Sequence, residues 1–402
     1  MTNRVLILTA GYGEGHNAAA RALAAAFDGN AGHGTAFVAD PFAQVSPRIN
    51  ALTRSLYLTV INDAPRLWSR VYGWIDRSSF VQRHLWLFRR EIRLLARLIA
   101  EKQPRAICCT YPLYAFFLEE IVRRGGGLPP VYNVVTDSIS IHSLWWRAGC
   151  TGWFLPNQDS AEVLLAAGIN PAAVHICGFP VPDFFALHAS TLSPPDLAPG
   201  ARPRVLHIIN SGTRHAAETA RLLLAENEWD ITCAVGRDVK LHSQLVRYAA
   251  KRHHPAKILA WTDQIPRLLM THHIVISKAG GATTQEAIAA LCPMIVNQIV
   301  PGQEEGNYEL LRRHGVGALA ETPDAVLAAL HRAFADQGRI WREWRAALRP
   351  LARVDAANEI ASQVLGVPAR PIDSPLAKIS AHQRDTTPHH APALGSIPGP
   401  AN

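Results

Sequence analysis

Polar residues that could carry out chemistry are concentrated in two neighbouring motifs. The motifs are Lys-Ala-Gly-Gly-Ala-Thr-Thr-Gln-Glu at 278–286 and Pro-Gly-Gln-Glu-Glu-Gly-Asn at 301–307. An apolar strand is expected to lead into a turn at Gly280 and Gly281, and a helix is expected to start near Ala282. A helix N-terminus presents free backbone N–H groups and the positive end of a dipole, which together suit a diphosphate. The first motif therefore predicts a phosphate-binding turn.

Side chains beyond this turn suit the rest of a nucleotide sugar. Glu286 lies about one helical turn further on, where a carboxylate can accept hydrogen bonds from two ribose hydroxyls. A second strand, expected at Met294–Gln298, would deliver Gln303, Glu304 and Asn307 to the same rim, where they suit a sugar ring. Phosphate, ribose and sugar contacts within one short unit predict a nucleotide-sugar site.

A glycine-rich loop near the N-terminus carries the candidate base. Gly11, Gly13 and Gly15 precede His16, and an alanine-rich helix follows. Glycines let a backbone approach a ligand closely, and imidazole, with an ordinary pKa of about 6.5, can take a proton near neutral pH. We therefore predict that His16 acts as a general base, with the alternative that it only caps the helix.

The same loop has a second interpretation, as the start of a nicotinamide-dinucleotide fold. Gly11-x-Gly13 and Asp40, at the end of the second expected strand, match parts of that fingerprint. However, His16 stands where the third glycine would be, and hydride transfer leaves both later motifs unexplained. The nucleotide-sugar interpretation is therefore favoured.

Both later motifs resemble the donor site of glycosyltransferase family 28, most closely the branch of monogalactosyldiacylglycerol synthases and processive diacylglycerol glucosyltransferases. That branch has a similar Lys-x-Gly-Gly-x-Thr-x-x-Glu-Ala turn followed by Pro-Gly-Gln-Glu-x-x-Asn, and the likeness covers roughly residues 3–345. The resemblance implies an α/β fold of the GT-B type, in which two doubly wound parallel-sheet (Rossmann-like) domains face each other across a cleft. It also implies an inverting hexosyltransferase that uses no metal and no other cofactor.

The resemblance implies roles for residues in both domains. His16 is the general base, and Asp137 orients His16 or the acceptor hydroxyl, unless it only caps a helix. His142 and Trp145 lie on the acceptor side, and Lys278 offsets leaving-group charge, unless it is only a solvated cation. The nucleotide sugar would contact Gly15, Ser211, Gly212, Thr213, Trp261, Thr262, Lys278, Gly280, Gly281, Thr283, Glu286, Gln303, Glu304 and Asn307.

Two of these loops carry a weaker signal, the first because it departs from the family and the second because backbone recognition needs no particular side chain. Ser211-Gly212-Thr213 has a single glycine where the family has a richer loop that helps to hold the diphosphate. Trp261-Thr262 corresponds to a strand-end turn whose backbone contacts uracil, a type of recognition that leaves little residue signature. Both loops imply contacts to the nucleotide, and the geometry of the first is left open.

Short apolar runs that alternate with helical stretches predict a parallel sheet in each half of the chain. The expected parts are an acceptor and membrane-side domain at 1–179, a proline-rich linker at 180–203, a nucleotide-sugar domain at 204–353, a helix at 354–366 that returns to the first domain, and a disordered tail at 367–402. The expected strands are Val5–Ala10, Thr35–Ala39, Ala106–Thr110, Val131–Val135, Gly152–Leu155, Val205–Asn210, Asp230–Val235, Lys257–Ala260, Ile274–Ser277 and Met294–Gln298.

Positive charge is concentrated in one segment of this 402-residue chain, whose formal net charge is +8. Residues 48–97 contain ten arginines and three acidic residues, together with several tryptophans. Arginine interleaved with tryptophan suits an anionic bilayer surface, where each cation contributes about 1 kcal/mol. The alternative is a pair of ordinary helices with solvated arginines. No nucleic-acid motif accompanies the charge, so we expect no nucleic-acid partner.

Other features favour the cytoplasm, with peripheral association at the inner face of the cell membrane. The chain has no apolar run of 18 residues and no recognisable signal peptide. Its six cysteines lack metal-ligand spacing and are expected to be reduced. His382, His389 and His390 in the tail could bind a metal, but a flexible tail is favoured.

The leading hypothesis is transfer of galactose or glucose from a UDP-sugar to a membrane lipid, with diacylglycerol as the acceptor. A related branch transfers N-acetylglucosamine to a lipid-linked peptidoglycan precursor, but the Pro-Gly-Gln-Glu motif favours the first branch. A nucleotide-sugar 2-epimerase is a further possibility on the same fold, but its acid and base are not recognisable here. A hypothesis of another class is a non-catalytic protein that binds nucleotide sugar or lipid, which the shortened Ser211-Gly212 loop supports.

Overall fold

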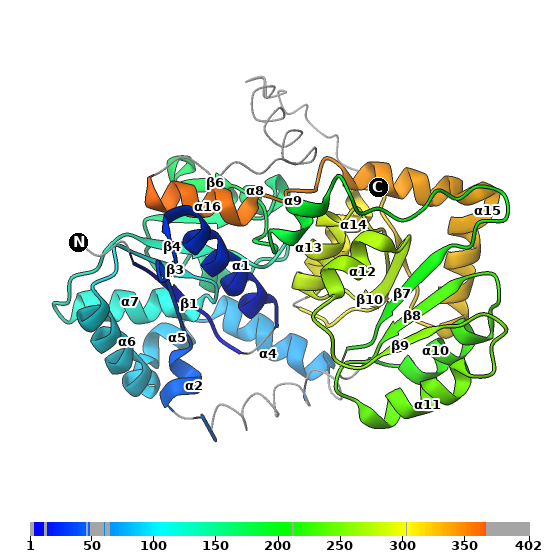
Figure 1. Cartoon of the computed structure of the whole chain (residues 1–402). Helices are drawn as coiled ribbons and strands as arrows, with labels where there is room; N and C mark the ends of the chain where they lie inside the picture. Colours follow the sequence, from blue (N-terminus) through cyan, green and yellow to red (C-terminus); the bar gives the residue numbers. More distant parts are fainter. Residues whose placement is uncertain are drawn as a thin grey trace, which may run out of the picture.

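The computed structural model describes residues 4–11, 14–45, 47–48, 60, 65–210, 213–302 and 304–366 (Figure 1). The predictions for Ser211, Gly212, Gln303 and the tail lie outside these ranges, as does part of the arginine-rich segment. The described chain forms two parallel six-stranded sheets with helices packed around each (Figure 1). The predicted α/β class with two parallel sheets is confirmed.

The first sheet has the strand order β2-β1-β3-β4-β5-β6. Helices cover its strands, so apolar residues are needed on both faces, and all four residues of β1 are buried. The sequence analysis missed β6, which has only three half-buried residues and pairs with a single neighbour at the sheet edge. The strands are β1 (Val5–Leu8), β2 (Ala36–Ala39), β3 (Ala106–Cys109), β4 (Val131–Val134), β5 (Gly152–Leu155) and β6 (Val174–Ile176).

Helices of the first half follow these strands, and the arginine-rich segment contributes four of the described ones. No helix in the described ranges is long and apolar enough to cross a membrane. The helices are α1 (Glu14–Ala31), α2 (Pro41–Val45), α4 (Pro65–Arg77), α5 (Phe80–Arg83), η1 (Leu85–Phe88), α6 (Arg89–Lys102), α7 (Leu113–Arg123), η2 (Ser143–Trp145), α8 (Gln158–Ala166), η3 (Pro171–Ala173) and α9 (Phe184–His188).

The second sheet has the strand order β12-β11-β10-β7-β8-β9. Here the sequence analysis missed β12, an edge strand of two residues. The strands are β7 (Arg204–Ile208), β8 (Asp230–Ala234), β9 (Lys257–Leu259), β10 (Ile274–Lys278), β11 (Met294–Gln298) and β12 (Ala318–Leu319). The helices are α10 (Ala216–Ala225), α11 (Val239–Ala249), α12 (Ile265–Thr271), α13 (Gly281–Ala289), α14 (Glu305–Arg313), α15 (Pro323–Leu348) and α16 (Ala356–Leu365).

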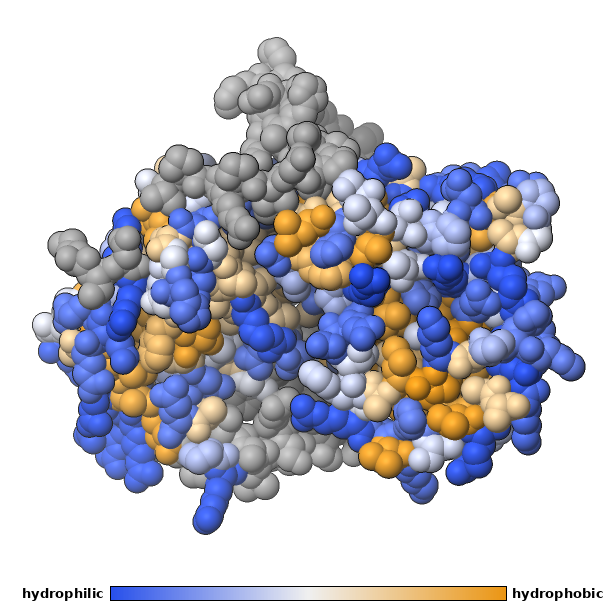
Figure 2. Space-filling model, viewed as in Figure 1, coloured by the Kyte–Doolittle hydropathy of each residue, from blue (hydrophilic) through white to orange (hydrophobic). Residues whose placement is uncertain are grey.

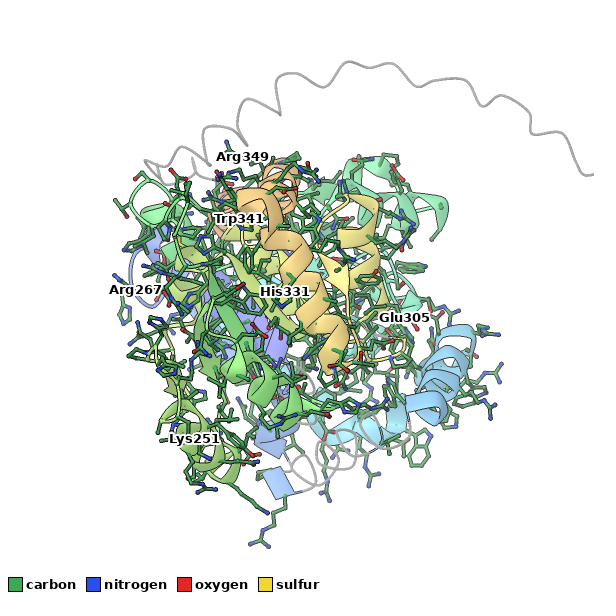
Figure 3. The ribbon with its side chains drawn as sticks, turned by 90° about the vertical axis from the view of Figure 1, so that its right-hand side faces the viewer. Lys251, Arg267, Glu305, His331, Trp341 and Arg349 are labelled. Atoms are coloured by element: carbon green, nitrogen blue, oxygen red, sulfur yellow. The ribbon has the colours of Figure 1, made fainter. Side chains whose placement is uncertain are left out.

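α15 is kinked at residues 335–338, where the backbone is not helical, and it packs against the core of the second sheet. Its Trp341 and His331, one on each side of the kink, mark that contact (Figure 3). Trp341 donates its indole N–H to the carbonyl oxygen of His273 at 2.7 Å. The His331 ring lies 4.7 Å from the ring of Trp229, measured between centroids. This helix therefore closes the second core.

The last described helix, α16, packs on the first domain rather than the second. Ile360 and Ala361 are fully buried in one cluster with Val5 of β1 and Phe27 of α1. Figure 1 shows α16 beside α1, although the two helices lie at opposite ends of the described sequence. The chain therefore crosses between the two sheets twice.

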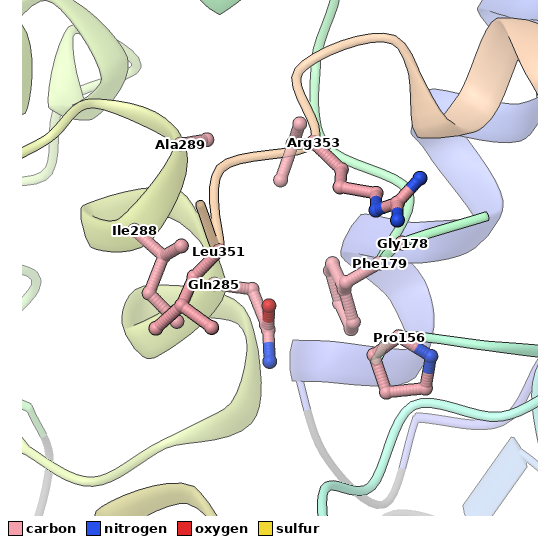
Figure 4. A pocket seen from close by; sticks show the side chains of 9 residues that line it. Pro156, Gly178, Phe179, Gln285, Ile288, Ala289, Leu351 and Arg353 are labelled. Atoms are coloured by element: carbon pink, nitrogen blue, oxygen red, sulfur yellow. The ribbon is translucent and has the colours of Figure 1, made fainter. Parts of the chain in front are cut away.

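The two crossings touch each other at Gly178 and Arg353. A Cβ built on Gly178 would lie 2.7 Å from the Cβ of Arg353, and the residue has a φ of +104°, so glycine is required on both counts. A cavity with room for about one water molecule lies beside this contact (Figure 4). Phe179, Gln285 and Leu351 are among its lining residues, so both domains contribute to its wall.

Candidate active site

The predicted phosphate-binding turn at the start of α13 lies close to the first domain. Gly280 caps the helix in an extended conformation, and Gly281 is its first residue. A Cβ built on Gly281 would lie 3.4 Å from the carbonyl oxygen of Thr136 in the first domain, and one built on Gly15 would lie 3.7 Å from the backbone nitrogen of Ala282. The two glycine motifs, far apart in sequence, therefore face each other.

His16 lies in the first turn of α1, beside this meeting point. Its Nδ1 is 2.9 Å from Thr136 Oγ1, and the ring of Tyr111 stands edge-on to it, 5.0 Å away between centroids. Desolvation by burial lowers the pKa of His16 from 6.5 to about 4, against a smaller raising effect of the Thr110 backbone. The imidazole is therefore neutral near pH 7, which is the form that can accept a proton.

Asp137 follows Thr136 at the end of β4, and its carboxylate contacts a different group. Asp137 Oδ2 accepts a hydrogen bond from Trp145 Nε1 at 2.7 Å. Burial raises the pKa of Asp137 to about 6, and the indole hydrogen bond partly opposes this shift. Of the two roles predicted for Asp137, orienting His16 or orienting the acceptor hydroxyl, the contact to His16 is made by the adjacent Thr136, which sequence reasoning missed.

His142 and Trp145, the residues predicted to lie on the acceptor side, bound the 3-10 helix η2. His142 caps that helix, because its Nδ1 accepts from the Leu144 backbone N–H at 3.2 Å. The helix-capping role weighed for Asp137 therefore belongs to His142. Trp145 is fully buried, and its indole N–H contacts Asp137 rather than open space.

An ion pair between Lys278 and Glu304 connects the motif at 278–286 with the motif at 301–307. Lys278 Nζ lies 2.7 Å from Glu304 Oε1, and Glu304 Oε2 accepts from the Val300 backbone N–H at 3.0 Å. Lys278 is thus paired rather than simply solvated. In this structure Glu304 is buried and braces the loop.

Asn307 makes a second link between the same motifs. Its Nδ2 donates to the carbonyl oxygen of Ala279 at 2.9 Å. Its Oδ1 is buried, with no hydrogen-bond partner among the described residues. This oxygen could accept a hydroxyl hydrogen without breaking an existing bond.

Glu286 lies half-buried on α13, facing α1 of the first domain. Burial raises the pKa of Glu286 to about 7, Arg21 opposes the shift and Glu14 adds to it. Arg21 and Glu14 form an exposed ion pair at 2.9 Å. A half-buried carboxyl group with few neighbouring partners is suited to a ligand that brings its own hydroxyl donors. Thr283 lies half-buried in the first turn of the same helix.

The remaining predicted contacts lie after other strands of the second sheet. Thr213 Oγ1 donates to the carbonyl oxygen of Asn210 at 2.8 Å, which closes the turn after β7. Trp261, after β9, is 63% exposed, and the Arg237 guanidinium lies 6.0 Å from its ring centroid. Thr262 Oγ1 accepts from the backbone of Gln264 at 3.1 Å. These loops follow strands at the carboxyl edge of the sheet, where open α/β sheets bind ligands.

A polar contact that sequence reasoning missed holds the domains together at this edge. Gln285 Nε2 donates to Ser138 Oγ at 3.0 Å, and both residues are buried. A side chain at Gly306 would collide with the carbonyl oxygen of Ser138. Only the tertiary structure reveals that these three residues meet.

Asp40, the residue that suggested a dinucleotide fold, is engaged locally. Its carboxylate accepts from the backbone N–H groups of Gly11 at 3.1 Å and Ala43 at 3.0 Å. These bonds tie the glycine-rich loop to the start of α2. Among the described residues, no group of three His, Cys, Asp or Glu side chains is placed to hold a metal ion.

Known proteins match this chain along most of its length. A family model described as monogalactosyldiacylglycerol (MGDG) synthase matches residues 16–181. The processive diacylglycerol beta-glucosyltransferase of Bacillus subtilis (strain 168) is 25% identical over 344 residues, which cover 84% of this chain and 89% of that protein. The protein of the same name from Bacillus cereus (strain AH187) is 24% identical over 366 residues, which cover 90% and 93%.

Solved structures share the fold. S. aureus MnaA in its UDP co-structure has a TM-score of 0.58 at 13% identity, covering 92% of this chain and 99% of that chain. Acinetobacter baumannii MurG has a TM-score of 0.55 at 13% identity, covering 90% and 99%. These likenesses confirm the predicted GT-B fold. The sequence matches above show that the chain is a glycosyltransferase similar to the monogalactosyldiacylglycerol synthases and processive diacylglycerol glucosyltransferases of family 28.

Proposed function

We propose that this glycosyltransferase moves galactose or glucose from a UDP-sugar to a membrane lipid, diacylglycerol, with inversion at the anomeric carbon. The observation that carries the proposal is the meeting of His16 and the start of α13, through Thr136 and Gly281. A proton acceptor from one domain thereby faces a diphosphate-binding helix end from the other. The Bacillus relatives are diacylglycerol glucosyltransferases, which supports the choice of a lipid acceptor.

In the proposed reaction the acceptor hydroxyl oxygen attacks the anomeric carbon while His16 takes its proton. The bond between that carbon and the oxygen of the β-phosphate breaks, and UDP leaves with the electron pair. The negative charge on UDP is stabilised by the N–H groups at the start of α13 and by Lys278. Bound diphosphate also raises the pKa of His16 from its low value in the free protein, because a nearby anion favours imidazolium.

Donor recognition is assigned to the second domain. Glu286 binds the ribose hydroxyls as a carboxylate, and the partnerless Asn307 Oδ1 accepts from the sugar. Trp261 and Thr262, in the turn after β9, are assigned to the uracil. Ser211, Gly212 and Gln303 keep their proposed donor contacts on the strength of the motifs alone.

The acceptor is proposed to arrive from an anionic membrane surface that binds the arginine-rich segment, at the inner face of the cell membrane. Trp74 of α4 is 55% exposed, Trp86 of η1 is 63% exposed and Leu87 is 50% exposed. Exposed arginines follow on α6, and Figure 2 shows hydrophilic and apolar side chains intermixed over this part of the surface. Aromatic side chains next to arginines suit the headgroup region of a bilayer.

The deciding assay combines purified protein, labelled UDP-glucose or UDP-galactose, and vesicles that contain diacylglycerol. We expect a glycolipid whose anomeric configuration is opposite to that of the donor. Absence of glycolipid with both donors, together with product from UDP-N-acetylglucosamine and a lipid-linked muramoyl-pentapeptide, would instead assign the peptidoglycan branch of the family.

The substitution His16→Ala distinguishes an enzyme from a non-catalytic binding protein. If the protein is an enzyme, His16→Ala should lower its turnover by a factor of about 100 or more while UDP still binds. The exposed His33, which pairs with Asp28 on the far end of α1, provides the control: His33→Ala should leave turnover unchanged. Equal activity of His16→Ala and the parent protein would rule out His16 as the base.

A further inference from the structure

Helix α4 lies between the acceptor-side loop and the donor loop, and Tyr72 contacts both. The Tyr72 ring is perpendicular to the His142 ring, with 4.5 Å between centroids. The backbone of Tyr72 also forms a hydrogen bond with the His142 side chain, which itself caps η2. One residue therefore holds the acceptor-side histidine by its ring and by its backbone.

The same ring packs against the donor loop of the second domain. A Cβ built on Gly302 would lie 3.1 Å from Tyr72 Cδ1 and 3.4 Å from Cγ, and Gly302 has a φ of +85°. Glycine is required at this position for the backbone and for the close approach of the ring. Two residues after Gly302, Glu304 forms the ion pair with Lys278. The contact of Tyr72 with Gly302 therefore lies next to this ion pair.

Other bonds attach α4 firmly to the acceptor-side loop. Asp76 Oδ1 accepts from the Ser143 backbone N–H at 2.7 Å, and Ser143 Oγ donates to the carbonyl oxygen of Asp76 at 2.7 Å. Arg147 donates to the carbonyl oxygen of Ser78 at 2.7 Å, just beyond the helix. A displacement of α4 must therefore move the acceptor-side loop and, through Tyr72, the turn at Gly302.

The outer face of α4 is suited to an anionic bilayer. Trp74 and Val71 are 55% and 39% exposed, and Arg70 and Arg77 are exposed on the same helix. Their positive charge complements anionic headgroups and their apolar surface suits the acyl boundary. The helix that would bind the lipid surface is thus the helix that contacts the donor loop.

We propose that Tyr72 is a positioning residue through which binding of α4 to an anionic lipid surface sets the donor loop and strengthens UDP-sugar binding. The proposal deepens the function proposed above and rests on it. The expected coupling is about five-fold or more in donor affinity. Its direction follows from the geometry, since a fixed α4 holds Gly302 and His142 in one arrangement.

The experiment measures the Kd of UDP-glucose and UDP-galactose with and without phosphatidylglycerol vesicles, for the parent protein, Tyr72→Ala and Tyr72→Phe. For whichever donor binds, vesicles should lower the Kd in the parent protein and in Tyr72→Phe, which keeps the ring. Vesicles should not change the Kd in Tyr72→Ala. Tyr248→Ala, which truncates a half-buried tyrosine of α11, should behave like the parent. Vesicle co-sedimentation should be the same for all four proteins.

Hydrogen exchange supplies a readout that needs no substrate. In the parent protein, vesicle binding should slow hydrogen exchange in the peptide that spans Val300 to Glu304. In Tyr72→Ala, the exchange rate of this peptide should not change. A parent protein that shows no vesicle effect, or a Tyr72→Ala protein that keeps it, would overturn the inference. A protein that shows the coupling but forms no glycolipid would overturn the proposed transferase function instead.

Discussion

Thr136 contacts both halves of the candidate site: its Oγ1 lies 2.9 Å from Nδ1 of His16, and its carbonyl oxygen lies against Gly281 at the start of α13. Thr136 thus contacts the His16 imidazole through its side chain and the second domain through its backbone. This makes the orientation of the candidate base dependent on domain contact.

Thr136→Val should lower kcat about three- to ten-fold, because the imidazole loses one hydrogen bond worth about 1 kcal/mol. The donor KM should change less, since Thr136 Oγ1 contacts His16 rather than a donor-binding side chain. Steady-state kinetics over a pH series provide the measurement, and Thr136→Ser should restore the parent profile. A valine variant with unchanged kcat would show that the Thr136 hydroxyl does not position His16.

Glu286 should make UDP binding depend on pH. Its carboxyl group has a pKa of about 7 in the free protein, and ribose hydroxyls bind the ionised form, so binding releases a proton. Affinity should therefore rise as the pH increases through about 7 and level off above about pH 8. Calorimetric titration of UDP against the parent protein and Glu286→Gln provides the measurement, because the comparison cancels the titration of UDP itself. The variant should bind more weakly, with the extra pH dependence gone.

Gly306→Ala should impair the contact between the domains. The new methyl group would collide with the carbonyl oxygen of Ser138, and forced displacement of packed backbone costs about 1–3 kcal/mol. We expect a lower Tm and a lower kcat/KM. Gly149→Ala is the matched control, because Gly149 is exposed and has open space around it. Equal effects of the two substitutions would argue against the interdomain contact.

His207 should make the second domain sensitive to acid. The residue is fully buried in β7, neither ring nitrogen has a hydrogen-bond partner in the described structure, and burial lowers its pKa to about 4. Between pH 6.5 and 4 the unfolded chain binds a proton that the native state does not, so stability is lost as the pH falls. At pH 5 the loss is about 2 kcal/mol for this one group.

Urea unfolding at pH 7 and pH 5 tests this expectation. His207→Leu should lose less stability between the two pH values than the parent protein. His253→Leu, at an exposed position, should behave like the parent. An unchanged difference in His207→Leu would mean that this histidine is hydrated or paired in solution.

The sequence by itself determined the two sheets and the local part of the donor site. Buried strands of a parallel sheet require continuous apolar runs, so β1 and β10 were readable, whereas β6 and β12 were too short and too exposed to leave a pattern. The turn at Gly280 and Gly281 was also readable, because a strand, two glycines and a helix start are adjacent in the chain.

The tertiary structure alone decided which side chains meet. Sequence reasoning expected Asp137 to orient either His16 or the acceptor hydroxyl, and could not show that the neighbouring Thr136 contacts His16. It also could not show that Tyr72 reaches Gly302. Such contacts join residues far apart in the chain, and their geometry depends on how two separately folded sheets pack. Local propensity and spacing fix the elements, whereas the distances between them are set by packing.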